Sequence, residues 1–227
     1  MIALSHAAGF AAAMITFLAA PANGATITYT APGPHQIHDG PAFMAPTLNV
    51  GGLLEPIALV TVTFTSVFHG HPADIDVLLV GPAGQNVMLM SDVGELLSEA
   101  ESIIDGVSLT FRDGAPSLPA NVRITSGVYA PTNYQGVVEE IPEMDRTFPN
   151  PPPPEPYGTT LSLFNGSDGN GTWTLFIQDD VDDESGVMDS WSLTITTVPE
   201  PGSALLCLAG AGALLSQQGR RRARRIS

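Results

Sequence analysis

The densest group of potential metal ligands is an acidic run near the C-terminal end of the chain. Asp179-Asp180-Val181-Asp182-Asp183-Glu184 places five carboxylates within six residues. Two unit charges about 4 Å apart, at an effective dielectric constant of about 20, repel each other by about 4 kcal/mol. A folded loop of this composition therefore favours a bound cation, and calcium suits irregular loops that offer oxygen ligands. A hydrated acidic turn without an ion is the alternative.

The spacing of these acids is not that of an EF-hand. With Asp180 as the first ligand, the sixth place is Ser185 rather than Gly and the twelfth is Trp191 rather than Glu. We therefore expect a calcium site built from the run together with other loops. The candidate ligands are Asp179, Asp180, Asp182 and Asp183 from the run, Asp74 and Asp76 from an earlier segment, and Asp92 or Asp113 as further possibilities.

A second group with metal-binding residue types is His69-Gly70-His71, followed by Asp74. Alternate histidines can share a zinc ion, but a catalytic zinc site needs three protein ligands and a water. Two residues separate His71 from Asp74, and no histidine follows downstream. These residues are therefore expected to form a solvated loop at the end of a strand rather than a zinc site.

Enzymatic and nucleic-acid-binding functions find little support in the composition. The formal net charge is −15, and the chain has no lysine. Nucleic-acid binding requires clustered cations, and the body between the two ends has only Arg112, Arg123 and Arg146, so this function is not expected. The only cysteine, Cys207, lies near the C-terminus, and no glycine-flanked nucleophile serine accompanies an alternating strand and helix pattern. We therefore predict that the chain is not an enzyme.

The elements that must position these residues are predicted to be strands. Apolar residues alternate with polar ones over several short stretches, which is the pattern of strands with one buried face. The alternating stretches are 60–65, 107–111, 173–178 and 191–196. Residues 75–80 are apolar at five of six positions, which indicates a central strand covered on both sides. Trp173 and Trp191 fall on the inward positions and are expected in the core.

Turn signals and one irregular segment complete the pattern. Residues 81–84 turn the chain toward a strand at 87–90, and Asn165-Gly166 and Asn170-Gly171 supply further tight turns. Residues 92–104 could form one short helix or an acidic loop. The segment 136–158 contains seven prolines and is expected to be a surface insert within one domain. Many short strands joined by such turns predict an all-β antiparallel sandwich.

The two ends of the chain differ from this body. Residues 1–25 carry a short apolar run and a zone of small residues, the pattern of a secretory signal peptide. Residues 198–227 carry Pro199-Glu200-Pro201, then fourteen mostly apolar residues expected to be a short helix, and then an arginine cluster that includes Arg220, Arg221 and Arg222. Fourteen helical residues rise about 21 Å, so a membrane span of about 30 Å would need the residues that follow as well.

The C-terminal order of Pro-Glu-Pro, apolar stretch and arginines resembles the PEP-CTERM sorting signal of bacteria. The resemblance covers about the last 30 residues. It implies transient anchoring in the inner membrane by a transmembrane helix, recognition by an exosortase-type processing enzyme, and delivery to the cell envelope, outer surface or extracellular matrix. A plain tail anchor that is never processed is the alternative.

The body also resembles a known family. Residues 74–84 (DIDVLLVGPAG), residues 171–179 (GTWTLFIQD) and residues 191–195 (WSLTI) resemble the P domain, or P/Homo B domain, of subtilisin-like proprotein convertases. The resemblance spans about residues 60–196. It implies a jelly-roll-like β-sandwich over residues 26–197. In the convertases this domain follows the protease and stabilises it, and no protease domain is evident here.

Three functions remain open from the sequence. The first is a non-catalytic exported module with a structural or binding role, supported by calcium. The second is an accessory domain of a separate subtilisin-like serine protease. The third is a module that binds exopolysaccharide through exposed aromatic side chains such as Tyr134 or Tyr157.

Overall fold

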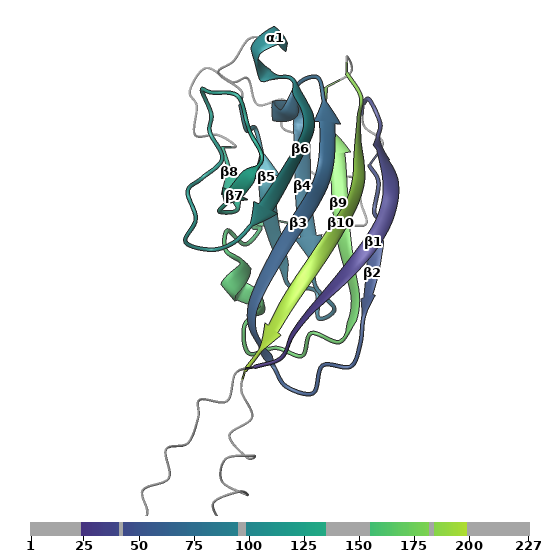
Figure 1. The fold of residues 1–227 in the computed structure, drawn as a ribbon, viewed down its shortest axis with the longest axis vertical. Coiled ribbons are helices and arrows are strands. Elements are labelled where there is room, and N and C mark those ends of the chain that lie inside the picture. The colour runs from purple at the N-terminus through teal and green to yellow at the C-terminus, as the bar shows by residue number, and fades with distance from the viewer. Residues whose placement is uncertain (1–23, 41–42, 95–98, 135–154, 182–183, 199–227) are drawn as a thin grey trace, which may run out of the picture. The chain divides into compact units, whose positions relative to one another are not determined.

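Residues 24–198 form a two-layered β-sandwich (Figure 1). The computed structural model describes residues 24–40, 43–94, 99–134, 155–181 and 184–198. The expected signal peptide, most of the proline-rich insert, Asp182, Asp183 and the whole sorting signal from Pro199 onward lie outside the described residues. The prediction of an all-β sandwich is confirmed.

Each sheet has five strands. The first sheet, sheet A, has the order β1-β10-β3-β6-β7. Its strands are β1 (Thr26–Ile37), β10 (Gly186–Thr197), β3 (Ile57–His69), β6 (Ile104–Phe111) and β7 (Gly127–Tyr129). All neighbours are antiparallel except β6 and β7, which are parallel.

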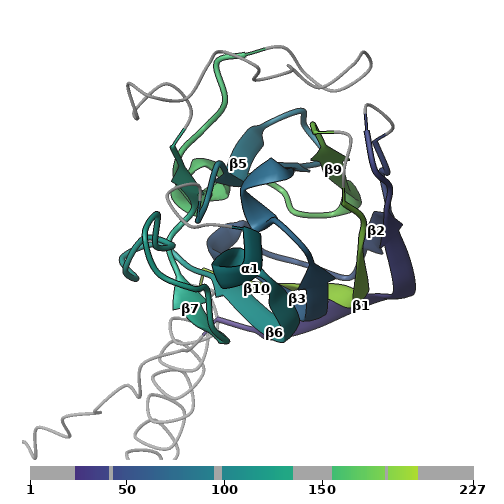
Figure 2. The same cartoon turned by 90° about the horizontal axis from the view of Figure 1, so that it is seen from above.

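The second sheet, sheet B, has the order β2-β9-β4-β5-β8. Its strands are β2 (Thr47–Val50), β9 (Gly171–Asp179), β4 (Ile75–Val80), β5 (Asn86–Ser91) and β8 (Thr132–Asn133). Here β5 and β8 form the parallel pair. The short helical elements are η1 (Pro72–Asp74), α1 (Glu99–Ser102) and η2 (Leu161–Phe164). Seen from above, the two sheets face each other as separate layers (Figure 2).

The core lies between the sheets and follows the predicted alternation. Trp173 and Trp191 are fully buried, as predicted. Phe164 packs on Trp173 with ring centroids 4.7 Å apart, and the indole Nε1 of Trp173 donates to the carbonyl of Gly169. Five of the six residues of β4 are buried, as expected for a central strand. Since Ile75 and Val77 face the core, the alternate residue Asp76 faces the outer side of sheet B.

The region predicted as a helix or an acidic loop, residues 92–104, is described except for residues 95–98. In its described part, α1 spans four residues, and Ile104 already begins β6. No helix among the described residues is long and apolar enough to cross a membrane. The predicted apolar tail helix lies beyond those residues.

The last strand holds a central place in sheet A. β10 is hydrogen-bonded to β1 on one side and to β3 on the other. Thr26 is paired with Thr196, and the main-chain N–H of Thr197 donates to the carbonyl of Ala25. The two ends of the described sandwich therefore lie side by side.

Candidate functional site

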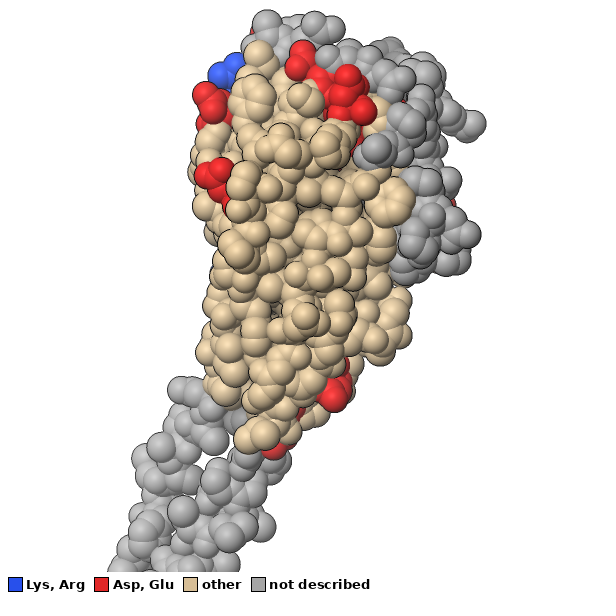
Figure 3. All heavy atoms as spheres, turned by 90° about the vertical axis from the view of Figure 1, so that its right-hand side faces the viewer, with Lys and Arg blue, Asp and Glu red and all other residues tan. Residues whose placement is uncertain are grey.

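Most of the residues singled out from the sequence lie at one end of the sandwich. This upper end is where β3 and β9 finish and where β4, β6 and β10 begin; α1 marks it in Figure 1. On the side of the molecule in Figure 3, most of the visible acidic residues lie at this end, and the broad middle carries no charged residue. On this face the acidic residues are therefore concentrated at the upper end.

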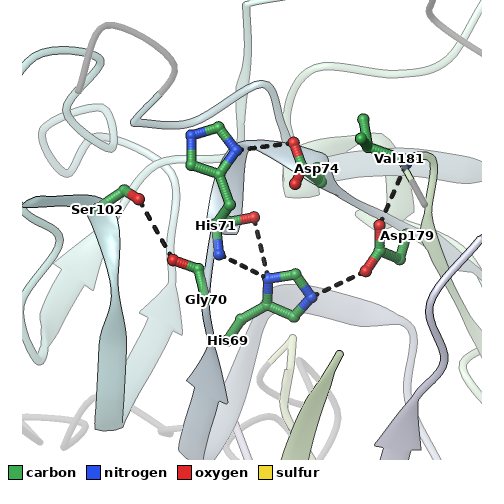
Figure 4. Close-up of polar contacts among 7 residues, drawn as sticks. All are labelled: His69, Gly70, His71, Asp74, Ser102, Asp179 and Val181. Carbon is green, nitrogen blue, oxygen red and sulfur yellow. Dashed lines mark hydrogen bonds and ion pairs between the residues drawn. The ribbon is translucent and has the colours of Figure 1, made fainter. Parts of the chain in front are cut away.

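A buried histidine–aspartate pair joins the two sheets at the upper end (Figure 4). His69 is the last residue of β3 in sheet A, and Asp179 is the last residue of β9 in sheet B. The His69 Nε2 atom lies 3.0 Å from Asp179 Oδ2, and both side chains are fully buried. The second oxygen, Asp179 Oδ1, accepts from the main-chain N–H of Val181 at 3.2 Å.

The other ring nitrogen of His69 is also engaged within the fold. Its Nδ1 lies 2.9 Å from the carbonyl oxygen of His71 and 3.2 Å from the main-chain nitrogen of the same residue. Both nitrogens of His69 are therefore tied to protein groups, which is how a histidine fastens two elements together. The prediction of a solvated loop is wrong for this residue, because His69 continues the inward face of β3 instead of leaving the sheet.

The loop after β3 is closed by further polar contacts. The His71 Nδ1 atom lies 2.8 Å from Asp74 Oδ1. The carbonyl of Asp74 accepts from the main-chain N–H of Asp180, which extends the pairing of β4 with β9 by one bond. The hydroxyl of Ser102, at the end of α1, donates to the carbonyl of Gly70 at 3.3 Å. These contacts bring the ends of β3, β4, β9 and α1 together.

Asp92 lies beside this group, directly after β5. Burial raises the pKa of the Asp92 carboxyl above its ordinary value, the hydrogen bond from Ser91 works in the opposite direction, and the nearby carboxylate of Asp74 raises it further. The backbone of Asp92 has a φ of 54°, in the left-handed region. Asp74 and Asp92 are thus neighbours, as a shared site would require.

The other predicted calcium ligands are dispersed. Asp179 points inward to His69, Asp76 faces the outer side of sheet B, and Asp113 accepts from the main-chain N–H groups of Leu161 and Ser162 near the start of η2. Among the residues that the structure describes, no three His, Cys, Asp or Glu side chains come together closely enough to hold a metal. Asp182 and Asp183 lie outside this part of the chain, so calcium binding by the acidic run stays a prediction.

The buried partnership of His69 with Asp179 was missed at the level of sequence, although one signal was present. Asp179 shares the alternation of Trp173, Leu175 and Ile177, all of which face the core. The same count places Gln178 on the outer face, where it is 1% exposed. Continuing the alternation to the end of the strand would have placed Asp179 on the inward face, apart from the acids that follow it.

The tyrosines proposed for sugar binding are less exposed than expected. Tyr134 packs against the main core, and its hydroxyl donates to the carbonyl of Leu118 at 2.7 Å. Tyr157 is half-buried and packs against a small apolar cluster on the outer face of sheet B that contains Leu78 and Phe176. Both tyrosines are thus partly buried, and sugar binding by them stays a prediction.

The comparison with protein families matches a part of the chain that contains one member of this pair, Asp179. Residues 155–195 match the model of the proprotein convertase P-domain. The P-domain match takes in η2, the whole of β9 and most of β10, and therefore includes Asp179 but not His69. No curated protein matches the chain.

Two solved structures are similar to the chain. One is a serine protease of Aeromonas sobria, with 15% identity over 77% of this chain and 27% of that chain and a TM-score of 0.41. The other is the same organism's serine protease in complex with a chaperone, with 15% identity over 78% of this chain and 27% of that chain and a TM-score of 0.42. The chain thus spans about a quarter of the length of these structures.

Proposed function

We propose that this chain is a non-catalytic β-sandwich module that is exported and held at the cell envelope or in the extracellular matrix, where it has a structural or binding role. The observation that carries the proposal is that both ring nitrogens of His69 are bound to protein groups, one to Asp179 and the other to the main chain of His71. An activating base needs one ring nitrogen on a nucleophile and the other on its orienting carboxylate. In His69 the place of the nucleophile is taken by the main chain of His71.

The P-domain match supports the same proposal. In the proprotein convertases, the P domain follows the protease and stabilises it without supplying catalytic residues. The matched residues contribute to the interior of the sandwich. Trp173 and Trp191 lie in its core, and Asp179 is paired with His69. A packed scaffold of this kind presents its outer surface and its loops to a partner.

The proposed location depends on the two ends of the chain. A signal peptide over residues 1–25 would direct export, and Pro199-Glu200-Pro201 with the apolar stretch and arginines would be read by an exosortase-type enzyme. The anchoring would be transient, because processing near Pro-Glu-Pro removes the apolar stretch. These steps rest on the resemblance of the sequence to a sorting signal.

Mass spectrometry of the native protein from cell and medium fractions tests the location. We expect surface-located material to lack the leader and to end near Pro199. Intact Arg220 to Arg225 on all surface-located material would contradict sorting. A peptidase assay on the purified protein tests the absence of catalysis, and hydrolysis that persists after removal of trace proteases would overturn the non-catalytic role.

The second candidate is an accessory role for a separate subtilisin-like serine protease. The P-domain match favours it, because that domain acts beside a protease in the convertases. Affinity purification of the tagged full chain from its own organism, with the partners identified by mass spectrometry, distinguishes the two roles. Enrichment of a protease, with a higher melting temperature for that protease in the mixture, supports the accessory role; an unchanged melting temperature counts against it.

A further inference from the structure

A polar row crosses the outer face of sheet B at its upper end. Asp76 of β4 is directly opposite Gln178 of β9 in the antiparallel pairing. Residues opposite each other project to the same face with their Cβ atoms about 4.5–5.5 Å apart. The neighbours Val77 and Ile177 face the core, so Asp76 and Gln178 both face outward. Both are nevertheless buried, at 5% and 1% exposure.

The side-chain oxygen of Gln178 has no hydrogen-bond partner. Its Oε1 is buried, and no protein donor reaches it. In native structures the great majority of buried polar side-chain atoms do have a partner, which is a protein group, a water or an ion. An amide oxygen that is buried beside a carboxylate and receives no N–H or O–H has the environment of a cation ligand.

A third oxygen lies on the other side of Asp76. Met90 of β5 is opposite Val77, so the next residue, Ser91, lies beside Asp76 on the outer face. Ser91 is fully buried, and its hydroxyl donates its hydrogen to Asp92 at 3.0 Å. Because that proton is committed to Asp92, the remaining lone pairs of the hydroxyl oxygen can accept from a cation.

We propose that Asp76, Gln178 and Ser91 bind a divalent cation on the outer face of sheet B, and that the ion is calcium. The three side chains offer only oxygen atoms, which suit calcium rather than zinc. Asp76 already makes a contact within the protein, and its carboxylate has about four lone-pair positions, so it can take a cation as well. The site shares Asp76 with the calcium site expected from the sequence but contains no residue of the acidic run, and it does not depend on export or sorting.

With one carboxylate, the site is expected to be weak, with a dissociation constant of about 10⁻³ M, as in extracellular modules. The first experiment compares the melting temperature of the purified full-length protein in EDTA, in 10 mM calcium chloride and in 10 mM magnesium chloride. Calcium is expected to raise the melting temperature by about 3–6 °C, and magnesium by less. No shift with calcium, together with no heat in a calorimetric titration, would overturn the proposal.

Two substitutions at Gln178 test whether its side-chain oxygen is a calcium ligand. Gln178→Met removes the unpartnered oxygen at similar volume, so it should abolish the calcium shift while raising the melting temperature in EDTA. Gln178→Glu puts a second carboxylate opposite Asp76, so it should lower the melting temperature in EDTA and tighten calcium binding about tenfold. If Gln178→Met keeps the full shift, or calcium fails to rescue Gln178→Glu, the oxygen is not a ligand.

Asp180→Asn and Asp189→Asn serve as matched controls, because each removes one negative charge from the same end without touching the three oxygens. Both are expected to retain the calcium shift. If Asp180→Asn abolishes the shift and Gln178→Met does not, the ion belongs to the acidic run and the site proposed here is wrong. Activity plays no part in these readouts, so the proposed function stands or falls separately.

Discussion

The two ends of the sandwich are held closed by different kinds of contact. At the upper end, a buried pair of ionisable side chains, His69 and Asp179, bridges the sheets. At the lower end, where β3 and β9 begin, side chains bind the main chain instead. Asn170 donates its Nδ2 to the carbonyl of Leu53 at 2.8 Å and accepts from the N–H of Leu53 at 3.0 Å. These two contacts join an amide side chain to the main chain and involve no ionisable group.

The two kinds of contact are expected to differ in how much stability is lost when one partner is removed. Loss of one member of a buried pair of ionisable side chains is strongly destabilising, because the other member stays buried without its hydrogen-bond partner. A side chain that bonds the main chain loses only those bonds. We therefore expect the upper end to be the more sensitive to charge and to ions. The lower end, where the exposed carboxylate of Asp168 accepts from Asn170, should respond only weakly.

The largest effect is expected from breaking the upper pair. Asp179→Ala leaves His69 buried without its partner and should lower the free energy of unfolding by about 3–5 kcal/mol. Urea denaturation measures the loss. The double variant His69→Leu/Asp179→Leu should recover part of it, since paired apolar residues need no compensation. A loss below about 1 kcal/mol in the single variant would show that the pair does not close this end.

A smaller loss is expected from the corresponding change at the lower end. Asn170→Ala removes both bonds to Leu53 and should cost about 1–3 kcal/mol, measured by the same method. Asn170→Asp keeps the acceptor but puts a carboxylate oxygen in place of the amide nitrogen, which lies 2.8 Å from both the Leu53 carbonyl and Asp168 Oδ1, so at pH 7 its loss should be at least as large. If Asn170→Ala costs more than Asp179→Ala, the contrast between the two ends is reversed.

Next in size is the cap formed by Asp113 on η2. Its two carboxylate oxygens accept from Leu161 N at 2.8 Å and from Ser162 N at 2.7 Å. Asp113→Ala should lower the free energy of unfolding by about 1–2 kcal/mol. Calcium should not alter this loss, because Asp113 lies away from the upper end. A calcium-dependent loss would link Asp113 to the predicted ion after all.

The smallest effect concerns Asp168, which precedes β9 and is exposed. The backbone N–H of Asn170, and secondarily its side-chain amide, lower the pKa of the Asp168 carboxyl below its ordinary value of 3.8. A lowered folded-state pKa contributes stability above the ordinary value, and this contribution is lost as the pH falls through the folded-state pKa. Asp168→Ala should therefore lower the melting temperature by about 1–2 °C at pH 7 and by less below about pH 3. A pH-independent difference would assign the effect to the turn alone.

Much of the fold could be predicted because alternation is a local signal. Residues 75–80 form a central strand as predicted, and both tryptophans are in the core. The first strand was not predicted. Residues 26–31 do alternate between polar and apolar side chains, but Pro32 and Pro34 follow at once, so the local pattern does not indicate a strand that continues to Ile37. The pairing with β10, at the far end of the chain, extends the strand past these prolines.

The site was harder to predict for a related reason. The run of carboxylates suggests that they share an ion. Asp179, however, still belongs to β9, and neighbours on a strand point to opposite faces, so Asp179 points inward and Gln178 outward. The partner of Asp179 is His69, 110 residues earlier in the chain. A contact of this separation depends on which strands become neighbours, and the sequence pattern does not specify that order.

The position of β10 between β1 and β3 has a consequence for how the chain folds. β1 hydrogen-bonds to no other strand of its sheet, so the first strand to leave the ribosome has no partner until the last one has been synthesised. Contacts between residues so far apart in sequence make folding slow, because a long loop must close first. A truncation within residues 186–197 would thus leave β1 and β3 unjoined.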